Sequence, residues 1–232
     1  MNVNLEFTAL TSLIGEPVRA TILWNLLDGR ALTATELAMR ANVSPPGASM
    51  HLNKLVQANL LAVESQGRHR YYRLSNAEVA FAVEALANLI PAKGENQPSP
   101  AKFRLLNDPK YCRTCYDHLA GTVGVAITER LVKQKIITPR EKEYDVTKKG
   151  IKFFADFGVD VEEMRMKRRF FAKTCLDWSE RKHHLSGILA AEFLARLIEL
   201  DWLRRIPDSR AVSITSAGKK GFAETLKLEL WN

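Results

Sequence analysis

The first ninety residues predict a series of short amphipathic helices. Apolar residues recur at helical spacing over 5–14, and a second helix begins near Pro17, a residue favoured in a first helical turn. Thr33 and Glu36 have the spacing of a capping box that opens a third helix. Ser44, followed by proline, predicts the start of a fourth helix after a short turn. This order of elements indicates a helix-turn-helix.

Two strand-like runs follow the fourth helix. Residues 61–64 and 70–74 are rich in branched or aromatic side chains, and the loop between them contains a glycine, which is the pattern of a β-hairpin. Asn76 is placed to cap a last helix that reaches Ile90. A helix-turn-helix closed by a hairpin predicts a winged helix-turn-helix over residues 1–90.

The rest of the chain reads as a separate domain that contains a duplication. Residues 91–100 hold three prolines, a glycine and no large apolar side chain, which indicates a linker. Beyond it, residues 101–232 contain two similar stretches, at about 112–160 and 172–230.

Each of these copies passes through the same motifs in the same order. His118 and His184 begin matching four-residue motifs that end in glycine, and a cysteine and an aspartate precede each motif. An apolar helix, a short strand-like stretch and a Thr-x-x-Gly motif then follow in both copies. Matched elements in one order indicate an internal repeat. We expect two related helical units that pack face to face and resemble degenerate winged helices, giving a mainly α chain with small β-wings, an α+β fold.

Composition and charge narrow the class of protein. With 46% apolar and 26% charged residues, the chain has the composition of a globular protein. No apolar run is long enough to predict a membrane span, and the N-terminus lacks the pattern of a secretory signal. Three cysteines, an odd number, favour the reducing cytoplasm over a disulfide framework. The net charge of +8 favours a polyanionic partner such as nucleic acid.

The helix that begins at Ser44 has the two faces expected of a DNA-reading helix. Its core face would carry Ala48, Leu52, Leu55 and Val56. The opposite face is small and polar at its N-terminal end, which suits insertion into a major groove, and the hairpin tip is cationic, which suits phosphate or minor-groove contact. The candidate DNA-binding residues are Ser44, Pro46, Gly47, Ser49, Met50, His51, Asn53, Lys54, Gln57, Arg68, His69 and Arg70.

These segments together resemble the ArsR family of winged-helix repressors. The resemblance covers roughly residues 5–90, and its matching segments are 15–19, 35–38, 44–55, 58–61 and 67–74. It implies a homodimer joined through the first and last helices of the domain, bound to an inverted repeat in double-stranded operator DNA. It also implies repression that an effector relieves.

The sequence departs from the ArsR family at the positions where family members often bind metal. The third helix has no cysteine, and the last helix of the domain offers no histidine or aspartate. Gly47 also stands where a hydroxyl or alanine is usual, which leaves the sequence preference open. The resemblance therefore implies that an effector acts in the C-terminal half.

Eight C-terminal residues are candidate effector ligands, and they lie at or just before the repeated helices: Cys112, Cys115, Asp117, His118, Cys175, Asp177, His183 and His184. If the two copies face each other with pseudo-symmetry, their cysteines and histidines converge. Such a set would suit a zinc-like or softer metal, or a thiol sensor of oxidants. A third possibility is a pocket for a small organic molecule, with Tyr116 and Trp178 in its walls. Duplication alone would also repeat packing residues and aspartates that cap helices.

Two rival functions stand beside a sequence-specific regulator. An architectural protein would bind DNA with little sequence preference and without an effector. A thiol redox enzyme would use Cys112 and Cys115, but no βαβ pattern surrounds them. Gly121 and Gly124 lack the full glycine pattern of a nucleotide-binding loop, so a packed apolar helix is expected there. The sequence predicts no enzyme and assigns no cofactor.

Overall fold

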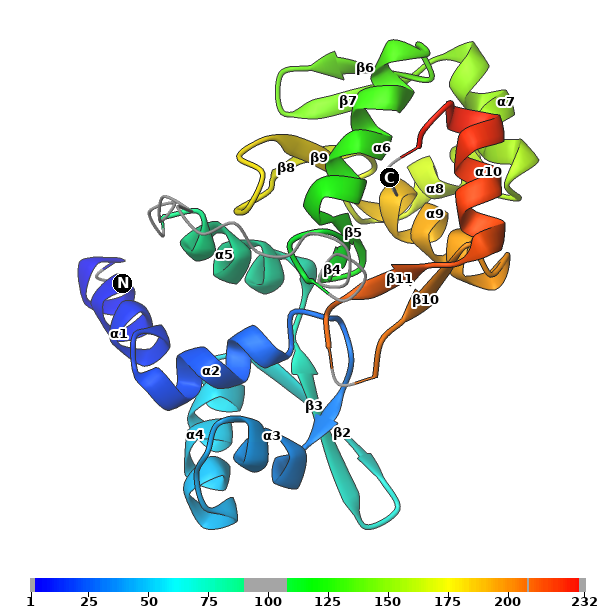
Figure 1. The fold of residues 1–232 in the computed structure, drawn as a ribbon. Helices are drawn as coiled ribbons and strands as arrows, with labels where there is room; N and C mark the ends of the chain where they lie inside the picture. Colours follow the sequence, from blue (N-terminus) through cyan, green and yellow to red (C-terminus); the bar gives the residue numbers. More distant parts are fainter. Residues whose placement is uncertain (1–2, 90–107, 208, 230–232) are drawn as a thin grey trace, which may run out of the picture. The chain divides into compact units, whose positions relative to one another are not determined.

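The computed structural model describes residues 3–89, 108–207 and 209–229, so the linker expected at 91–100 lies outside the described residues. The chain divides into two compact units, Met1–Leu86 and Ala87–Asn232. Helices and several short antiparallel sheets occur in the chain, which confirms the α+β class (Figure 1).

The N-terminal unit follows the predicted order of helices and hairpin. Its elements are α1 (Val3–Ile14), α2 (Pro17–Asn25), β1 (Leu32–Thr33), α3 (Ala34–Arg40), α4 (Pro45–Gln57), β2 (Leu61–Gln66), β3 (His69–Leu74) and α5 (Ala77–Ala87). Thr33 and Glu36 form the predicted capping box, and the Ser44 hydroxyl accepts a hydrogen bond from the backbone N–H of Gly47. These caps fix where α3 and α4 begin, and thereby set the turn between them.

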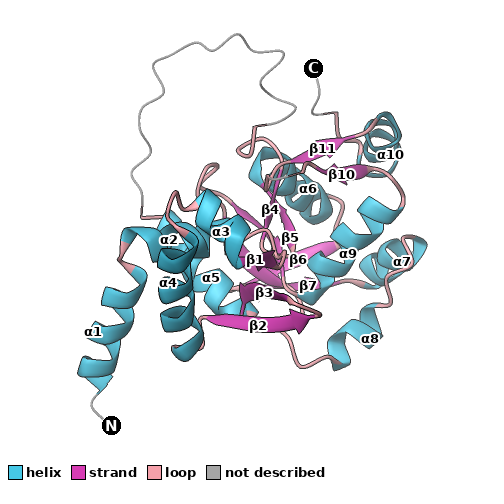
Figure 2. Cartoon of the chain, turned by 90° about the horizontal axis from the view of Figure 1, so that it is seen from below, coloured by secondary structure: helices cyan, strands magenta, loops and turns pink. Residues whose placement is uncertain are grey.

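The wing of this unit is a three-stranded sheet in the order β1-β3-β2 (Figure 2). The hairpin β2–β3 is longer than predicted, because its strands continue to Gln66 and resume at His69. Strand β1 pairs with β3 and is not predicted by the sequence, since two residues are too few to show an alternation. Leu32 in β1 and Tyr72 in β3 are both buried, so this pairing joins the wing to the helical core.

The C-terminal unit contains the duplication as two copies of hairpin, helix, hairpin and helix. The first copy comprises β4 (Arg113–Cys115), β5 (His118–Ala120), α6 (Gly121–Lys133), β6 (Ile137–Arg140), β7 (Glu143–Val146) and α7 (Lys148–Asp156), with α8 (Val161–Met166) after it. The second comprises β8 (Lys173–Leu176), β9 (His183–Ser186), α9 (Ile188–Glu199), β10 (Leu203–Arg205), β11 (Val212–Ile214) and α10 (Ser216–Leu226). The threonines of both Thr-x-x-Gly motifs cap the helix after the second hairpin, as a degenerate winged helix requires.

The first hairpin of each copy differs from the sequence prediction. The repeated cysteines and histidines lie in paired strands and not at the starts of helices. Gly121 and Gly187 separate each hairpin from its helix, with φ angles of 78° and 88°. A Cβ at Gly121 would lie 2.5 Å from the carbonyl oxygen of Lys110, and one at Gly187 would lie 2.7 Å from that of Phe170. Glycine at the same place in both copies therefore allows an abrupt strand-to-helix turn.

Strands of one copy pair with strands of the other copy. In the sheet β6-β7-β8-β9, the second hairpin of the first copy joins the first hairpin of the second copy. The reciprocal contact is a bridge between Arg113 and Ala211. Equivalent hydrogen bonds run from Thr174 N to Lys142 O, at 3.0 Å, and from Thr114 N to Arg210 O, at 2.9 Å. The copies thus pack with approximate two-fold symmetry, which brings their first hairpins together.

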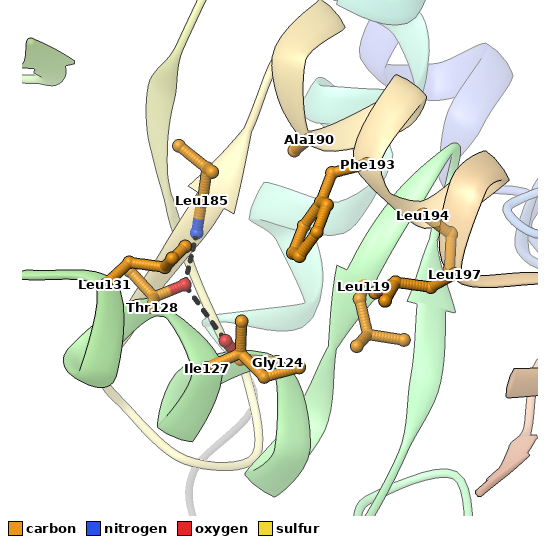
Figure 3. A pocket seen from close by; sticks show the side chains of 10 residues that line it. All are labelled: Leu119, Gly124, Ile127, Thr128, Leu131, Leu185, Ala190, Phe193, Leu194 and Leu197. Carbon is orange, nitrogen blue, oxygen red and sulfur yellow. Dashed lines mark hydrogen bonds between the residues drawn. The ribbon is translucent and has the colours of Figure 1, made fainter. Parts of the chain in front are cut away.

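Helices α6 and α9 supply much of the core between the copies. Leu119, Ile127, Phe193 and Leu197 line a small internal cavity of about 20 Å³ (Figure 3). The hydroxyl of Thr128 at its edge donates to the Gly124 carbonyl and accepts from the Leu185 N–H, so it is satisfied without a ligand. A cavity of this size holds about one water molecule and no organic ligand.

Candidate functional sites

Helix α4 presents the two predicted faces. Ala48, Leu52 and Leu55 are fully buried, and Val56 is partly buried. The exposed face of α4 carries Pro46, Met50, Asn53, Lys54 and Gln57. This face offers amide, ammonium and thioether groups without a large aromatic side chain, which is compatible with entry into a major groove.

Four other predicted contacts on α4 have partners within the unit. The Ser44 hydroxyl caps the helix at Gly47, which is itself partly buried. The Ser49 hydroxyl donates to the Pro45 carbonyl at 3.0 Å. The His51 ring is partly buried, and its Nδ1 lies 3.2 Å from the Glu16 carboxylate. A histidine in that position orients α4 against the start of α2.

The tip of the wing carries three exposed cationic or titratable side chains. Arg68, His69 and Arg70 are all exposed, and Gly67 adopts a φ of 58° in the turn before them. The Arg70 guanidinium lies 5.6 Å from the centre of the Tyr72 ring, a cation–π contact that restrains its stem. The side chains at this tip are free to meet a polyanion beside the helix α4.

In the C-terminal unit, two cysteines and two histidines meet in a buried cluster. Cys115 pairs with His118 across the hairpin β4–β5, and Cys175 pairs with His184 across β8–β9. Residues directly opposite in an antiparallel pair place their side chains on one face of the sheet. Each hairpin therefore offers one sulfur and one imidazole, and the two-fold packing of the copies brings both pairs together. We call these four residues the Cys–His cluster.

The ligand atoms of the Cys–His cluster all lie within 4.8 Å of one another. The Sγ atoms of Cys115 and Cys175 are 3.9 Å apart. The Nε2 atoms of His118 and His184 are 3.1 Å apart. All four side chains are buried, so the cluster is closed to bulk water.

A carboxylate lies behind each imidazole of the cluster. Asp117 Oδ1 is 3.3 Å from His118 Nδ1, and Asp177 Oδ2 is 3.5 Å from His184 Nδ1. Asp177 is completely buried, and its Oδ2 accepts from the Arg113 guanidinium at 2.9 Å and from the Gly121 N–H at 2.7 Å. The expectation that the repeated aspartates cap helices thus holds for Asp177, which caps α6 of the other copy. Asp117 contacts His118 and Arg169 instead.

The two imidazoles of the cluster have opposite electrostatic environments. Burial would lower the pKa of His118, but Cys115 and the Asp117 carboxylate raise it to about 9. Burial and the charge of His118 place the pKa of His184 well below its usual value. Burial alone would raise the pKa of Asp177. The Arg113 guanidinium and several hydrogen-bond donors outweigh this effect and lower the pKa, so the carboxylate is ionised. The Nε2 atoms of these two imidazoles, whose pKa values are shifted in opposite directions, lie within hydrogen-bond distance of each other.

The remaining effector candidates do not join the cluster. Cys112 lies in the main apolar core, where burial raises the pKa of its thiol to about 12. His183 is exposed at the start of β9. Tyr116 and Trp178 do not line the internal cavity, which is in any case too small for the organic ligand considered from the sequence.

Sequence reasoning missed Arg113, one of the largest fully buried side chains. Its guanidinium pairs with Asp177 and lies 4.6 Å from the centre of the Trp178 ring. The sequence did contain a signal for this residue. Arg113 precedes Cys115 by two residues, just as Lys173 precedes Cys175 by two residues in the other copy. Residues two apart on a strand share a face, so a cation in both copies indicates a residue that supports the cluster.

The fold and the exposed face of α4 define a winged helix-turn-helix protein. A family model described as a helix-turn-helix domain matches residues 14–64. The HTH-type transcriptional regulator YdfF of Bacillus subtilis is 43% identical over 228 residues, which span 98% of this chain and 100% of YdfF. The chain therefore belongs to the helix-turn-helix transcriptional regulators, and it is a DNA-binding regulator rather than an enzyme.

Two further similarities each cover less than half of this chain. The transcriptional repressor SdpR of Bacillus subtilis is 36% identical over 83 residues, which are 36% of this chain and 90% of SdpR. The structure of reduced HlyU from Vibrio cholerae is 29% identical with a TM-score of 0.35, and the match covers 38% of this chain and 90% of HlyU. Among the described residues, no helix has both the length and the apolar character needed to cross a membrane.

Proposed function

We propose that this regulator is a homodimeric repressor of the ArsR type that an effector, acting on the C-terminal unit, releases from double-stranded operator DNA. The observation that carries the proposal is the exposed polar face of α4 beside the cationic tip of the wing. In a helix-turn-helix the second helix enters the major groove and the wing contacts the adjacent backbone.

Specific roles follow from the chemistry of the exposed side chains on α4. The amides of Asn53 and Gln57 match the donor and acceptor pattern of an adenine edge. The Lys54 ammonium reaches either a guanine edge or a phosphate. The exposed N-terminal turn around Pro46 lies at the positive end of the helix dipole, which favours a phosphate.

The exposed apolar side chains of α1 and α5 support a dimer. None of the 12 residues of α1 is buried, although the helix carries Val3, Leu5 and Phe7. On α5, Phe81 is 54% exposed. Apolar side chains concentrated on two exposed helices mark an interface, and a two-fold dimer would bury the same surface on both protomers. Two copies of α4 would then read two half-sites of an inverted repeat.

Two features of the C-terminal unit support the proposed effector role: its buried helices and its buried polar cluster. The first helix of each copy, α6 or α9, is buried on much of its surface, so neither offers a reading face like that of α4. A small set of polar side chains is instead buried in the interior of this unit, at the Cys–His cluster and beside it. A buried polar cluster in a duplicated unit that follows a DNA-reading unit in the chain suits the detection of a signal better than DNA contact.

The proposal is tested by measuring DNA binding of the full chain by fluorescence anisotropy at one fixed salt concentration. The probes are the promoter of its own gene and a scrambled duplex of the same composition. A specific repressor binds its operator about 10³-fold or more tightly than unrelated DNA. Equal affinity for both duplexes would instead identify an architectural DNA-binding protein.

Two lysine variants locate the interface. Lys54→Ala weakens binding to both duplexes if this side chain contacts phosphate, and weakens operator binding selectively if it contacts a base. Lys152→Ala is the matched control, because it removes an exposed lysine from α7 of the C-terminal unit. Asn53→Ala lowers the affinity for the operator by about 1–3 kcal/mol and leaves binding to scrambled DNA unchanged. Equal effects of Lys54→Ala and Lys152→Ala would contradict the assigned reading face.

A further inference from the structure

We propose that Cys115, His118, Cys175 and His184 form a four-coordinate site for a zinc-class divalent ion that joins the two copies of the C-terminal unit. Two thiolates and two imidazoles make a complete ligand set for zinc, with no coordination position left for a substrate. The set is buried and convergent, and each copy supplies half of it.

The separations between ligand atoms fit a tetrahedral ion. Zinc–sulfur and zinc–nitrogen bond lengths place two sulfurs about 3.8 Å apart and two nitrogens about 3.3 Å apart around a tetrahedral centre. The corresponding separations here are 3.9 Å for Sγ–Sγ and 3.1 Å for Nε2–Nε2. Both histidines direct the same ring atom, Nε2, toward each other, and all four ligand atoms lie within 4.8 Å of one another.

The residues behind the ligands have the arrangement found around protein-bound zinc. A ligating imidazole usually directs its second nitrogen to a carboxylate, which fixes the orientation of the ring. Asp117 lies behind His118 and Asp177 lies behind His184, each at the Nδ1 atom. The His184 Nδ1 atom is buried and makes no hydrogen bond, although it is 3.5 Å from Asp177. Metal at Nε2 would fix the tautomer that carries a proton on this Nδ1.

Apolar packing alone does not explain these two cysteines. Cys112 provides the comparison, because it packs as an apolar side chain in the large core of this unit. Cys115 and Cys175 instead form a separate small group with Ala120, next to two imidazoles. Thiolates combined with imidazoles in a tetrahedral arrangement suit zinc and similar transition-metal ions, whereas magnesium and calcium require oxygen ligands.

The placement of the ligands predicts what the ion does. Because each copy contributes one cysteine and one histidine, the site is complete only while the copies hold their two-fold arrangement. Binding of the ion therefore stabilises that arrangement, and its removal loosens the C-terminal unit. The inference that the ion is the effector rests on the proposed function, whereas the metal site itself does not.

The site is tested with Co²⁺ as a spectroscopic substitute, added to the full chain after removal of metal with a chelator. We expect one Co²⁺ per protomer, visible absorption of a tetrahedral ion, and near-ultraviolet sulfur-to-metal charge transfer. Zn²⁺ should displace Co²⁺ and bleach both bands. A spectrum of octahedral Co²⁺ without charge transfer, or no binding above the level of an adventitious ion, would overturn the proposal.

Variants assign the ligands. Cys115→Ser and Cys175→Ser should each abolish most of the charge transfer and weaken Co²⁺ binding about 100-fold or more, whereas Cys112→Ser, the matched buried control, should retain both. Asp117→Asn keeps all four ligands and should weaken binding about 10- to 100-fold. If a ligand variant fails to fold, alkylation of the wild-type chain decides, because Zn²⁺ should protect two of the three cysteines. Equal labelling of all three with and without Zn²⁺ contradicts the site.

A separate arm distinguishes the metal site from the proposed function. Operator affinity is measured with the Zn²⁺-loaded and the chelated full chain. A change of about 10-fold or more supports the ion as the effector. Unchanged operator affinity, with tetrahedral Co²⁺ bound, would overturn the effector role and leave a structural metal site. A Cys115–Cys175 disulfide formed on oxidation, in a chain that binds no Co²⁺, would identify a thiol sensor and overturn the metal proposal.

Discussion

The helix before the wing differs between the N-terminal unit and the two copies of the C-terminal unit. Helix α4 buries one apolar stripe and exposes its opposite face, including its first turn. Helix α6 buries seven of its 13 residues, whereas α4 buries three of 13, and the N–H of Gly121 in the first turn of α6 is already bonded to the Asp177 carboxylate. An anion can approach the first turn of α4, but the first turn of α6 holds its own internal carboxylate.

The hairpins that follow these helices also differ, since one is exposed and the other is paired within a larger sheet. The hairpin β2–β3 ends in exposed cations, whereas β6–β7 continues into a four-stranded sheet with β8–β9. The same order of helix and hairpin therefore has different surroundings in the two units. In the N-terminal unit its polar groups face solvent, which suits recognition of a partner. In the C-terminal unit it packs against the second copy, and the buried Cys–His cluster lies on the hairpins that precede it, β4–β5 and β8–β9.

The largest effect on stability is expected when the buried ion pair inside the C-terminal unit is broken. Asp177→Asn removes the charge partner of Arg113, whose side chain is 1% exposed. An unpaired buried charge typically costs about 3–5 kcal/mol, so we expect a corresponding loss in the unfolding free energy of the C-terminal unit. Urea unfolding of the chelated chain, followed by circular dichroism, measures it.

An exposed ion pair of the same unit provides the control for Asp177→Asn. Asp201 pairs with Arg204 at the surface, where both side chains are more than half exposed. Asp201→Asn should leave the unfolding free energy almost unchanged, because solvent screens an exposed ion pair. If the two variants were equally stable, Asp177 would not organise the interior of this unit.

The N-terminal unit was predictable because its signals are local. The capping box at Thr33 and the Ser44–Pro45 start lie within four residues of the groups that they satisfy, and both are confirmed. The face of α4 followed from helical spacing alone. The contact between His51 and Glu16 was not predicted, because the two residues are distant in sequence and no periodicity reveals a side chain that turns toward another helix.

The C-terminal unit was predictable only as far as its duplication. The repeat indicated which residues correspond, and pseudo-symmetry then predicted that the two cysteines and two histidines meet. Strands β4 and β5 were missed because each has three residues and a tight turn between them, with Tyr116 at a φ of 61°. The Arg113–Asp177 pair joins residues 64 positions apart, which no local pattern encodes.

An intermediate effect, on the stability of the proposed dimer, is expected from a substitution on the exposed helix α1. Phe7→Glu places a charge in the proposed dimer interface, where the Phe7 side chain is 64% exposed in the protomer. Burial of such a side chain contributes about 1.5–3 kcal/mol per protomer, and two-fold symmetry places the change on both protomers. Sedimentation should show a monomer at concentrations where the wild-type chain dimerises. Met166→Glu, at an exposed position after the C-terminal β7–α7 segment, is the control and should leave the dimer intact.

The smallest effect is expected at the wing tip, where Arg68 is exposed and its proposed role is a phosphate contact. Each neutralised phosphate contributes about 0.9 to the slope of log affinity against log salt concentration. Because a dimer carries two wings, Arg68→Ala should reduce this slope by about 1.8 for operator and scrambled DNA alike. Arg140→Ala, at the end of the corresponding C-terminal strand β6, should leave the slope unchanged. Equal slopes for all three proteins would show that exposed cations on this hairpin do not meet DNA, and the contrast between the two kinds of wing would then rest on sheet pairing alone.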